Sequence, residues 1–143
     1  MMIRNILKKK GDAVVTIGVF DSVRDAIDSM VEHHIGAVVM TNGAEVLGVV
    51  SERDILKAIS DSGVSTLNAP IGHIVTGELV TITPEETTRR VMQLMTHSHV
   101  RHLPVMENGK LAGIVSVGDI VKYHLEELEM ESNVLRDLAI AVR

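Results

Sequence analysis

Apolar and polar residues alternate along this chain in short blocks that predict small strands and amphipathic helices. The β-branched runs VVTI at residues 14–17 and LVTI at 79–82 are typical of strands. Apolar residues at positions 23, 26, 27, 30 and 31 recur with the spacing of one helix face. One Asn-Gly pair lies between the apolar runs GAVVM and EVLGVV, and a second lies between HLPVM and KLAGIV. An Asn-Gly pair between two such runs favours a hairpin, so two hairpins are predicted. The pattern therefore predicts the order strand, helix, strand, strand, helix, twice.

Capping residues indicate where these helices begin. Ser22 precedes the first periodic stretch and is followed three residues later by an acidic side chain, which approximates a capping box. In the second half we expect Thr83 to cap a helix that starts at Pro84, with Glu85 and Glu86 near its positive end. A last helix in each half is expected after the serines at 51 and 116.

The two halves of the chain are copies related by a shift of 65 residues. The run Val15-Thr16-Ile17 falls on Val80-Thr81-Ile82, and about a dozen of some forty aligned positions are identical, against roughly three expected by chance. One such sheet is too small and one-sided to bury itself. We therefore predict an α+β fold of two pseudo-symmetric β-α-β-β-α repeats packed sheet to sheet. The expected boundaries are 3–62 for the first repeat, 63–70 for a linker, 71–128 for the second repeat and 129–143 for a C-terminal helical tail.

Composition narrows the possible functions. The 143 residues are 45% hydrophobic and 23% charged, as in a packed globular protein. A net charge of −5, with one Phe and one Tyr, argues against a nucleic-acid binder. The chain has no cysteine and no apolar run of the roughly 20 residues that a membrane helix needs. We expect a cytoplasmic protein that contacts neither membrane nor nucleic acid, with the lysines at 8–10 in a solvated turn.

One octapeptide occurs in both copies, as GVVSERDI at 48–55 and GIVSVGDI at 113–120. Helix capping alone accounts for a serine followed three residues later by an aspartate. The same geometry also suits a ligand. A helix that starts directly after a strand directs backbone N–H groups at open space, where the serine hydroxyl adds a donor for an anion. The aspartate can accept hydrogen bonds from a ribose diol, so a ribose-phosphate ligand and a simple cap both remain open.

The whole arrangement resembles the cystathionine β-synthase (CBS) domain, and the chain is similar to a stand-alone CBS pair, or Bateman module. The resemblance covers about residues 3–125 and rests on the order of elements, on RHLPV at 101–105 and on the doubled octapeptide. It implies clefts between the copies that bind adenosine-containing ligands: AMP above all, or ADP, ATP, NADH or S-adenosylmethionine. It also implies a homodimer that passes its signal to an unidentified protein target.

The resemblance assigns roles to particular residues. It implies ribose binding by Asp54 and Asp119, with Ser51 and Ser116 near the sugar or phosphate. Arg101 and His102 are expected to face the Ser51/Asp54 site, and Arg53 the Ser116/Asp119 site. The adenine pocket is expected to be formed by Thr16, Ile17, Ala37, Val38, Val49, Thr81, Ile82, Leu103, Pro104 and Ile114. Prolines at 84 and 104, where the first copy has valines, argue against two equivalent sites.

These observations predict a regulatory module that senses energy or redox state and is not an enzyme. The chain has no P-loop, no G-x-S-x-G elbow and no dinucleotide fingerprint. Histidines 97, 99 and 102 lie close together in sequence, but His97 and His99 straddle a predicted helix end, where they would point apart, so we expect no metal site. Two alternatives remain: an interaction scaffold whose clefts are empty, and a metal-dependent enzyme built on the histidines.

Overall fold

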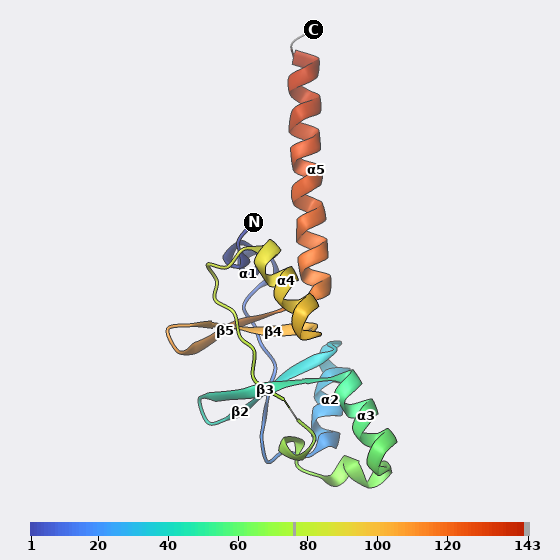
Figure 1. Ribbon diagram of the computed structural model, residues 1–143. Coiled ribbons are helices and arrows are strands. Elements are labelled where there is room, and N and C mark those ends of the chain that lie inside the picture. Colours follow the sequence, from blue (N-terminus) through green and yellow to red (C-terminus); the bar gives the residue numbers. More distant parts are fainter. Residues whose placement is uncertain (76, 142–143) are drawn as a thin grey trace.

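The computed structural model describes residues 1–75 and 77–141, which form two lobes and one projecting helix (Figure 1). The first lobe contains a three-stranded sheet of order β1-β2-β3 and the second a two-stranded sheet, β4-β5. The chain order is α1 (Ile3–Lys10), β1 (Thr16–Gly18), α2 (Val23–His33), β2 (Ala37–Asn42), β3 (Glu45–Ser51), α3 (Glu52–Ser62), η1 (Val64–Asn68), η2 (Ile71–His73), α4 (Thr88–Ser98), β4 (His102–Glu107), β5 (Lys110–Ser116) and α5 (Val117–Ala141). The α+β class and the pairing of two repeats are as predicted.

Each lobe buries its own apolar cluster between its sheet and its helices. In the first lobe Val23, Val38 and Val50 are fully buried, and in the second Leu103 and Ile120 are. The two sheets meet through β3 and β4, so that strands from both lobes flank the space between them (Figure 1). Helix-capping predictions hold for α2, where Ser22 and Asp25 form a complete capping box. Both hairpins form antiparallel pairs with a bulge at the equivalent position.

The second copy lacks the first strand that its sequence predicts. In the first copy Val15 O accepts a hydrogen bond from Val39 N at 3.0 Å, and β1 pairs in parallel with β2. Pro104 occupies the position of Val39 and has no N–H to donate, so the equivalent bond cannot form. Only an isolated bridge between Ile82 and Val105 remains. The prediction of β-α-β-β-α therefore needs correction in the second repeat, where a proline has shortened the ladder.

The helix predicted to start at Pro84 begins four residues later. Thr87, not Thr83, caps α4, and its hydroxyl accepts from Arg90 N at 3.2 Å. The preceding residues form a turn in which Thr83 N donates to the Glu86 side chain at 2.7 Å. Thr87 lies 65 residues after Ser22, so the internal repeat gave the correct start where the proline cue did not.

The segment that leads into each repeat packs on the opposite lobe. Helix α1 lies beside α5 at the second lobe (Figure 1), where Ile3 and Ile6 are fully buried in its cluster. Residues 64–75 return to the first lobe, where Ile71 is fully buried. Equivalent backbone hydrogen bonds of 2.6–3.1 Å hold both segments. In the first segment Ile3 N donates to Glu86 O and Arg4 N to Pro84 O. In the second, Ile71 N donates to Asp21 O and Gly72 N to Val19 O.

This exchange follows a shift of 68 residues, not 65. Ile3 corresponds to Ile71 and Leu7 to Val75, because the first copy has three more residues before its strand. Each leading segment presses on a glycine of the opposite lobe: a Cβ at Gly113 would lie 2.6 Å from a Leu7 methyl carbon. Lysines 8–10 form the last turn of α1, and all three residues are exposed, so they are solvated as predicted but lie at a helix end and not in an irregular turn.

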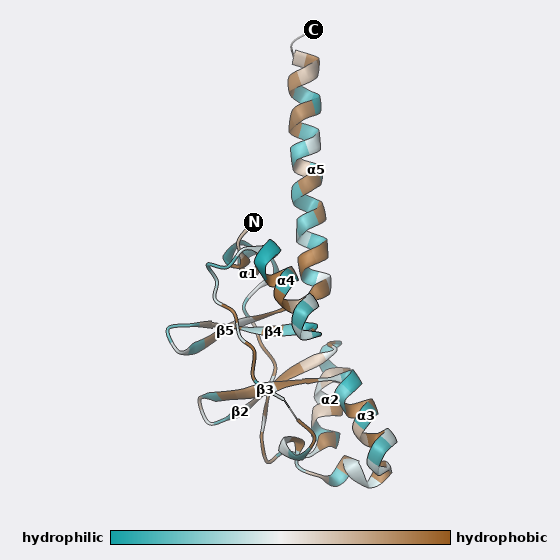
Figure 2. Ribbon diagram, viewed as in Figure 1, coloured by the Kyte–Doolittle hydropathy of each residue, from teal (hydrophilic) through white to brown (hydrophobic). Residues whose placement is uncertain are grey.

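Helix α5 extends far beyond the second lobe (Figure 1). The expected tail, 129–143, ends in residues 142–143, which lie outside the described part of the chain. Apolar and polar residues alternate along its projecting part (Figure 2). Leu125, Leu128, Leu135 and Leu138 are each about half exposed or more. Among the described residues, no helix is long and apolar enough to span a membrane.

Candidate ligand-binding clefts

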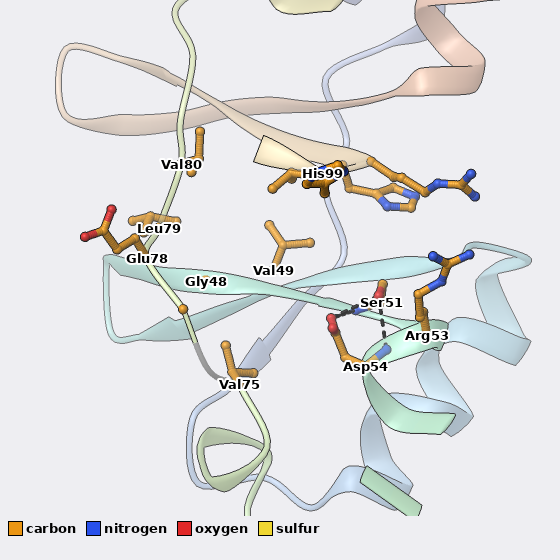
Figure 3. A pocket seen from close by; sticks show the side chains of 14 residues that line it. Gly48, Val49, Ser51, Arg53, Asp54, Val75, Glu78, Leu79, Val80 and His99 are labelled. Carbon is orange, nitrogen blue, oxygen red and sulfur yellow. Dashed lines mark hydrogen bonds between the residues drawn. The ribbon is translucent and has the colours of Figure 1, made fainter. Parts of the chain in front are cut away.

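Two clefts between the lobes are related by the internal repeat. The first, named here the Asp54 cleft, has a volume of about 230 Å³. The second, the Asp119 cleft, has a volume of about 340 Å³. The Asp54 cleft is lined by Val49, Ser51, Arg53, Asp54, Glu78, Leu79, Val80, His99, Val100, Arg101 and His102, with Gly48, Val75 and Gly77 (Figure 3). The Asp119 cleft is lined by Lys10, Ala13, Val14, Val15, His34, Ile35, Gly36, Ala37, His102, Ile114, Ser116 and Asp119.

Ser51 and Asp54 form a capping box at the point where β3 passes into α3 (Figure 3). Ser51 Oγ accepts from Asp54 N at 3.3 Å, and Asp54 Oδ2 accepts from Ser51 N at 2.8 Å. The cap thus uses one carboxylate oxygen, and an ionised carboxylate has about four acceptor positions on two oxygens. The Asp54 residue is exposed to the cleft. Capping and ligand binding are therefore compatible at this aspartate.

The opposite wall of the Asp54 cleft comes from the second lobe. His99 ends α4 in the left-handed conformation with φ 54°, and the chain then turns into β4. This turn places Arg101 and His102 on the same cleft as Ser51 and Asp54. The expected convergence of residues from the two copies is thus present at this cleft.

Arg53 lies elsewhere than expected. The resemblance placed it at the Ser116/Asp119 site, but it lines the Asp54 cleft, in the first turn of α3 beside Asp54 (Figure 3). Its side chain also borders a groove formed with α4 and α5. The second cleft receives Gly36 at the position that corresponds to Arg101. The two clefts therefore differ in charge.

The Asp119 cleft contains a lysine that sequence analysis did not foresee. Lys10 Nζ donates to Asp119 Oδ2 at 2.5 Å and to the Ile114 carbonyl oxygen at 2.7 Å. Asp119 also caps α5 with Ser116, whose N donates to Oδ2 at 2.9 Å. Burial raises the pKa of Asp119, but hydrogen bonds from Lys10 and Ser116 outweigh it and leave the pKa below its usual value.

His102 borders both clefts and is half-buried. Burial is the largest influence and lowers the pKa of His102, and the positive charges of Lys10 and Arg101 lower it further. Asp119 and Glu52 act in the opposite direction without cancelling the effect. The imidazole is therefore neutral near pH 7 and can both donate and accept one hydrogen bond.

The structure places only some of the residues predicted for the adenine pocket at the clefts. Val49 lines the Asp54 cleft, and Ala37 and Ile114 line the Asp119 cleft. Four predicted wall residues instead belong to the apolar clusters inside the lobes: Ile17, Val38, Ile82 and Leu103. Pro104 is buried, and Thr16 and Thr81 are exposed, but none of the three lines either cleft. The apolar walls come from the preceding residues, Leu79 and Val80 in one cleft and Val14 and Val15 in the other.

Strand alternation explains part of this error. Neighbouring residues on a strand point to opposite faces, and Val38 and Leu103 are the core-facing neighbours of Ala37 and His102, which line a cleft. Ile17 and Ile82 instead lie two or three positions after the residues that line the clefts. The internal repeat could not correct this choice, because it pairs Ile17 with Ile82 just as it pairs Val14 and Val15 with Leu79 and Val80. Among the described residues, no group of three or more His, Cys, Asp or Glu side chains is placed to hold a metal ion.

Comparison with known proteins agrees with this architecture. The CBS domain model matches residues 3–61 and 71–126. The chain belongs to the CBS domain family. The CBS domain-containing protein CBSX3, mitochondrial, of Arabidopsis thaliana is 37% identical over 140 residues, which span 89% of this chain and 68% of that protein.

Solved structures of CBS proteins share the fold. A CBS-domain-containing protein of Agrobacterium tumefaciens is 39% identical, with a TM-score of 0.84 over 87% of this chain and 99% of that one. The CBS domain pair of protein MJ0100, in complex with 5′-methylthioadenosine and S-adenosyl-L-methionine, is 20% identical, with a TM-score of 0.78. That comparison covers 89% of this chain and 98% of that one and bears on the fold alone.

Proposed function

We propose that this CBS pair is a regulatory module, without catalytic activity of its own, that binds an adenine nucleotide in the Asp54 cleft. One observation carries the proposal. Asp54, at the start of a helix, lies in the same cleft as Arg101 and His102 of the opposite lobe. A carboxylate can accept both hydroxyls of a ribose, and an arginine can bind phosphate through two parallel hydrogen bonds.

The ribose and phosphate contacts would lie on opposite walls of the cleft. Val49, Leu79 and Val80 offer aliphatic surface in the same cleft, which suits an adenine ring in a chain that has almost no aromatic residues. The known ligands of the MJ0100 pair, 5′-methylthioadenosine and S-adenosyl-L-methionine, both contain adenosine, which supports this ligand class. AMP is the ligand we favour, because the arginines at 53 and 101 supply positive charge that a neutral adenosine would not use.

A ligand that bridges the two lobes would couple its presence to their relative position. Because the leading segments cross between the lobes, a movement of one lobe relative to the other would also displace α1 and residues 64–75. We infer that a second protein binds the module differently in the two states. We also infer that the module is a homodimer and acts in the cytoplasm. ADP, ATP and NADH are the competing ligands, and their binding would make the module a sensor of energy or redox state.

The test is a calorimetric titration with AMP, adenosine and 2′-deoxy-AMP. AMP should bind more tightly than adenosine, and the difference should shrink as salt is raised, because exposed charges are screened. Arg101→Gln should remove most of that difference, whereas Arg24→Gln, an exposed arginine on α2, serves as the matched control. Loss of one ribose hydroxyl in 2′-deoxy-AMP should weaken binding. If none of the three compounds binds, AMP is not the ligand, and titrations with ADP, ATP and NADH that also show no binding would establish the scaffold alternative.

A further inference from the structure

The two clefts differ most at the carboxylate that would hold ribose. In the Asp119 cleft, Lys10 bridges Asp119 and the Ile114 carbonyl, so its ammonium joins the helix and the strand of this wall. The side chains of Lys10 and Asp119 are only 24% and 22% exposed. Salt screens a partly buried charge pair less than an exposed one. Lys10 Nζ and Ser116 N both donate to Oδ2, so a ribose diol that uses both carboxylate oxygens would have to displace the Lys10 ammonium.

The position of Lys10 is fixed by the packing of α1. Ile3 and Ile6 are fully buried in the second lobe, and Leu7 fills the space above Gly113. Arg4 adds an ion pair of 2.7 Å to Glu107. The lysine lies one turn further along the same helix, so its backbone cannot move away unless α1 leaves the lobe.

The sequence counterpart of Lys10 in the Asp54 cleft has the opposite charge and lies away from Asp54 (Figure 3). At the shift of 68 residues that relates Leu7 to Val75, Lys10 corresponds to Glu78, which lines the Asp54 cleft. An ionised glutamate has no proton to donate to a second carboxylate. Within the part of the chain that the structure describes, Asp54 forms no ion pair. Its carboxylate is therefore open to ligand hydroxyls.

The opposite wall of each cleft adds a second difference, which also favours a ligand in the Asp54 cleft. The Asp54 cleft has Arg101, whereas the Asp119 cleft has Gly36 at that position. A phosphate in the Asp119 cleft would thus lose its arginine, and the only nearby cation, Lys10, is already bound to the aspartate among the residues described.

We propose that Lys10 closes the Asp119 cleft to ribose-containing ligands, so that each chain binds a single nucleotide, in the Asp54 cleft. This inference rests on the proposed function and assigns its site. A diol at Asp119 would have to displace the Lys10 ammonium, and a hydroxyl–carboxylate hydrogen bond carries charge on one partner only, whereas the Lys10–Asp119 bond is also an ion pair. We expect AMP to bind the Asp119 cleft at least about tenfold more weakly than the Asp54 cleft.

Lys10→Met tests this directly, because methionine keeps the length of the side chain and removes the ammonium. Calorimetry with AMP should give one site per wild-type chain and two sites per Lys10→Met chain. Lys8→Met, an equal charge change in the same last turn of α1, should leave one site. Asp54→Asn should weaken AMP binding at least about tenfold, and Asp54→Asn combined with Lys10→Met should restore one tighter site. Melting temperatures would show that each variant is folded.

The possible failures are distinct. Two sites in the wild type, one of them lost on Asp119→Asn, would overturn the inference and leave the proposed function intact. A single site in Lys10→Met, unchanged in affinity, would also overturn it. If AMP binds to none of the variants, including Lys10→Met, both the inference and the proposed function are wrong.

Discussion

Ile71→Ala tests whether the leading segment of the second repeat holds the first lobe together. By sequence, Ile71 opens the second repeat, yet its side chain is fully buried in the cluster of the first lobe. Its N also donates to Asp21 O at 2.6 Å, which fixes the backbone around the buried side chain. The substitution removes three carbons from a closely packed site.

The magnitude follows from this burial. Loss of three buried carbons costs roughly 2.4 kcal/mol in transfer free energy at about 0.8 kcal/mol per carbon. The cavity left behind adds to this, so we expect the free energy of unfolding to fall by about 3–4 kcal/mol, within the range measured for such substitutions. A loss of that size is a large fraction of the stability of an ordinary domain.

Urea unfolding at fixed protein concentration measures the effect. Val64→Ala is the matched control, because Val64 lies in the same connecting segment but is 71% exposed and should change stability by no more than about 0.5 kcal/mol. We expect a single transition for the wild type, since each lobe carries a segment of the other. An Ile71→Ala protein as stable as the control would refute the exchange of segments between the lobes.

Two further predictions concern pH and assembly. Because burial lowers the pKa of His102, the unfolded chain binds a proton more readily than the folded one. The free energy of unfolding should therefore fall as pH drops below about 6.5, the usual pKa of histidine. His102→Asn should reduce this fall in urea titrations at several pH values. An unchanged pH dependence would contradict the lowered pKa of His102. The protein should sediment as a dimer at micromolar concentration. An open apolar groove of about 620 Å³ lies between α2 and α3 and exposes Val31 and Leu56, each 69% accessible, and such an exposed apolar surface is typical of a protein interface. Leu56→Asp should produce monomers, and a monomeric wild type would show that the groove is not a dimer interface.

The sequence predicted the fold because the repeat is preserved where packing requires it. A constant shift of 65 residues identified both hairpins and the caps of the last helices. The prediction failed where local chemistry differs between the copies. Pro104 removed a ladder hydrogen bond, and Pro84 suggested a helix start that Thr87 provides instead.

The site was predictable as far as a motif could specify it. Asp54 and Arg101 were expected to share a cleft, and they do. Lys10 could not be assigned to Asp119, because the leading segments follow a different shift and pack on the opposite lobe. Such long-range exchange leaves no periodic signal in the sequence, and the correspondence of Ile3 with Ile71 shows only that the segments are related, not on which lobe they pack.

The measurement that tests the central claim most directly is calorimetric binding of AMP to the wild type and to Asp54→Asn, with melting temperatures alongside. Asparagine keeps the shape of the side chain and one acceptor for the cap, but it loses the charge and directs an amide donor at the ligand hydroxyls. A hydrogen bond to a charged group is worth about 1.5–3 kcal/mol, so binding should weaken at least about tenfold while the protein stays folded. Equal AMP affinity of the two proteins would mean that Asp54 only caps α3, and the nucleotide site would have to be abandoned.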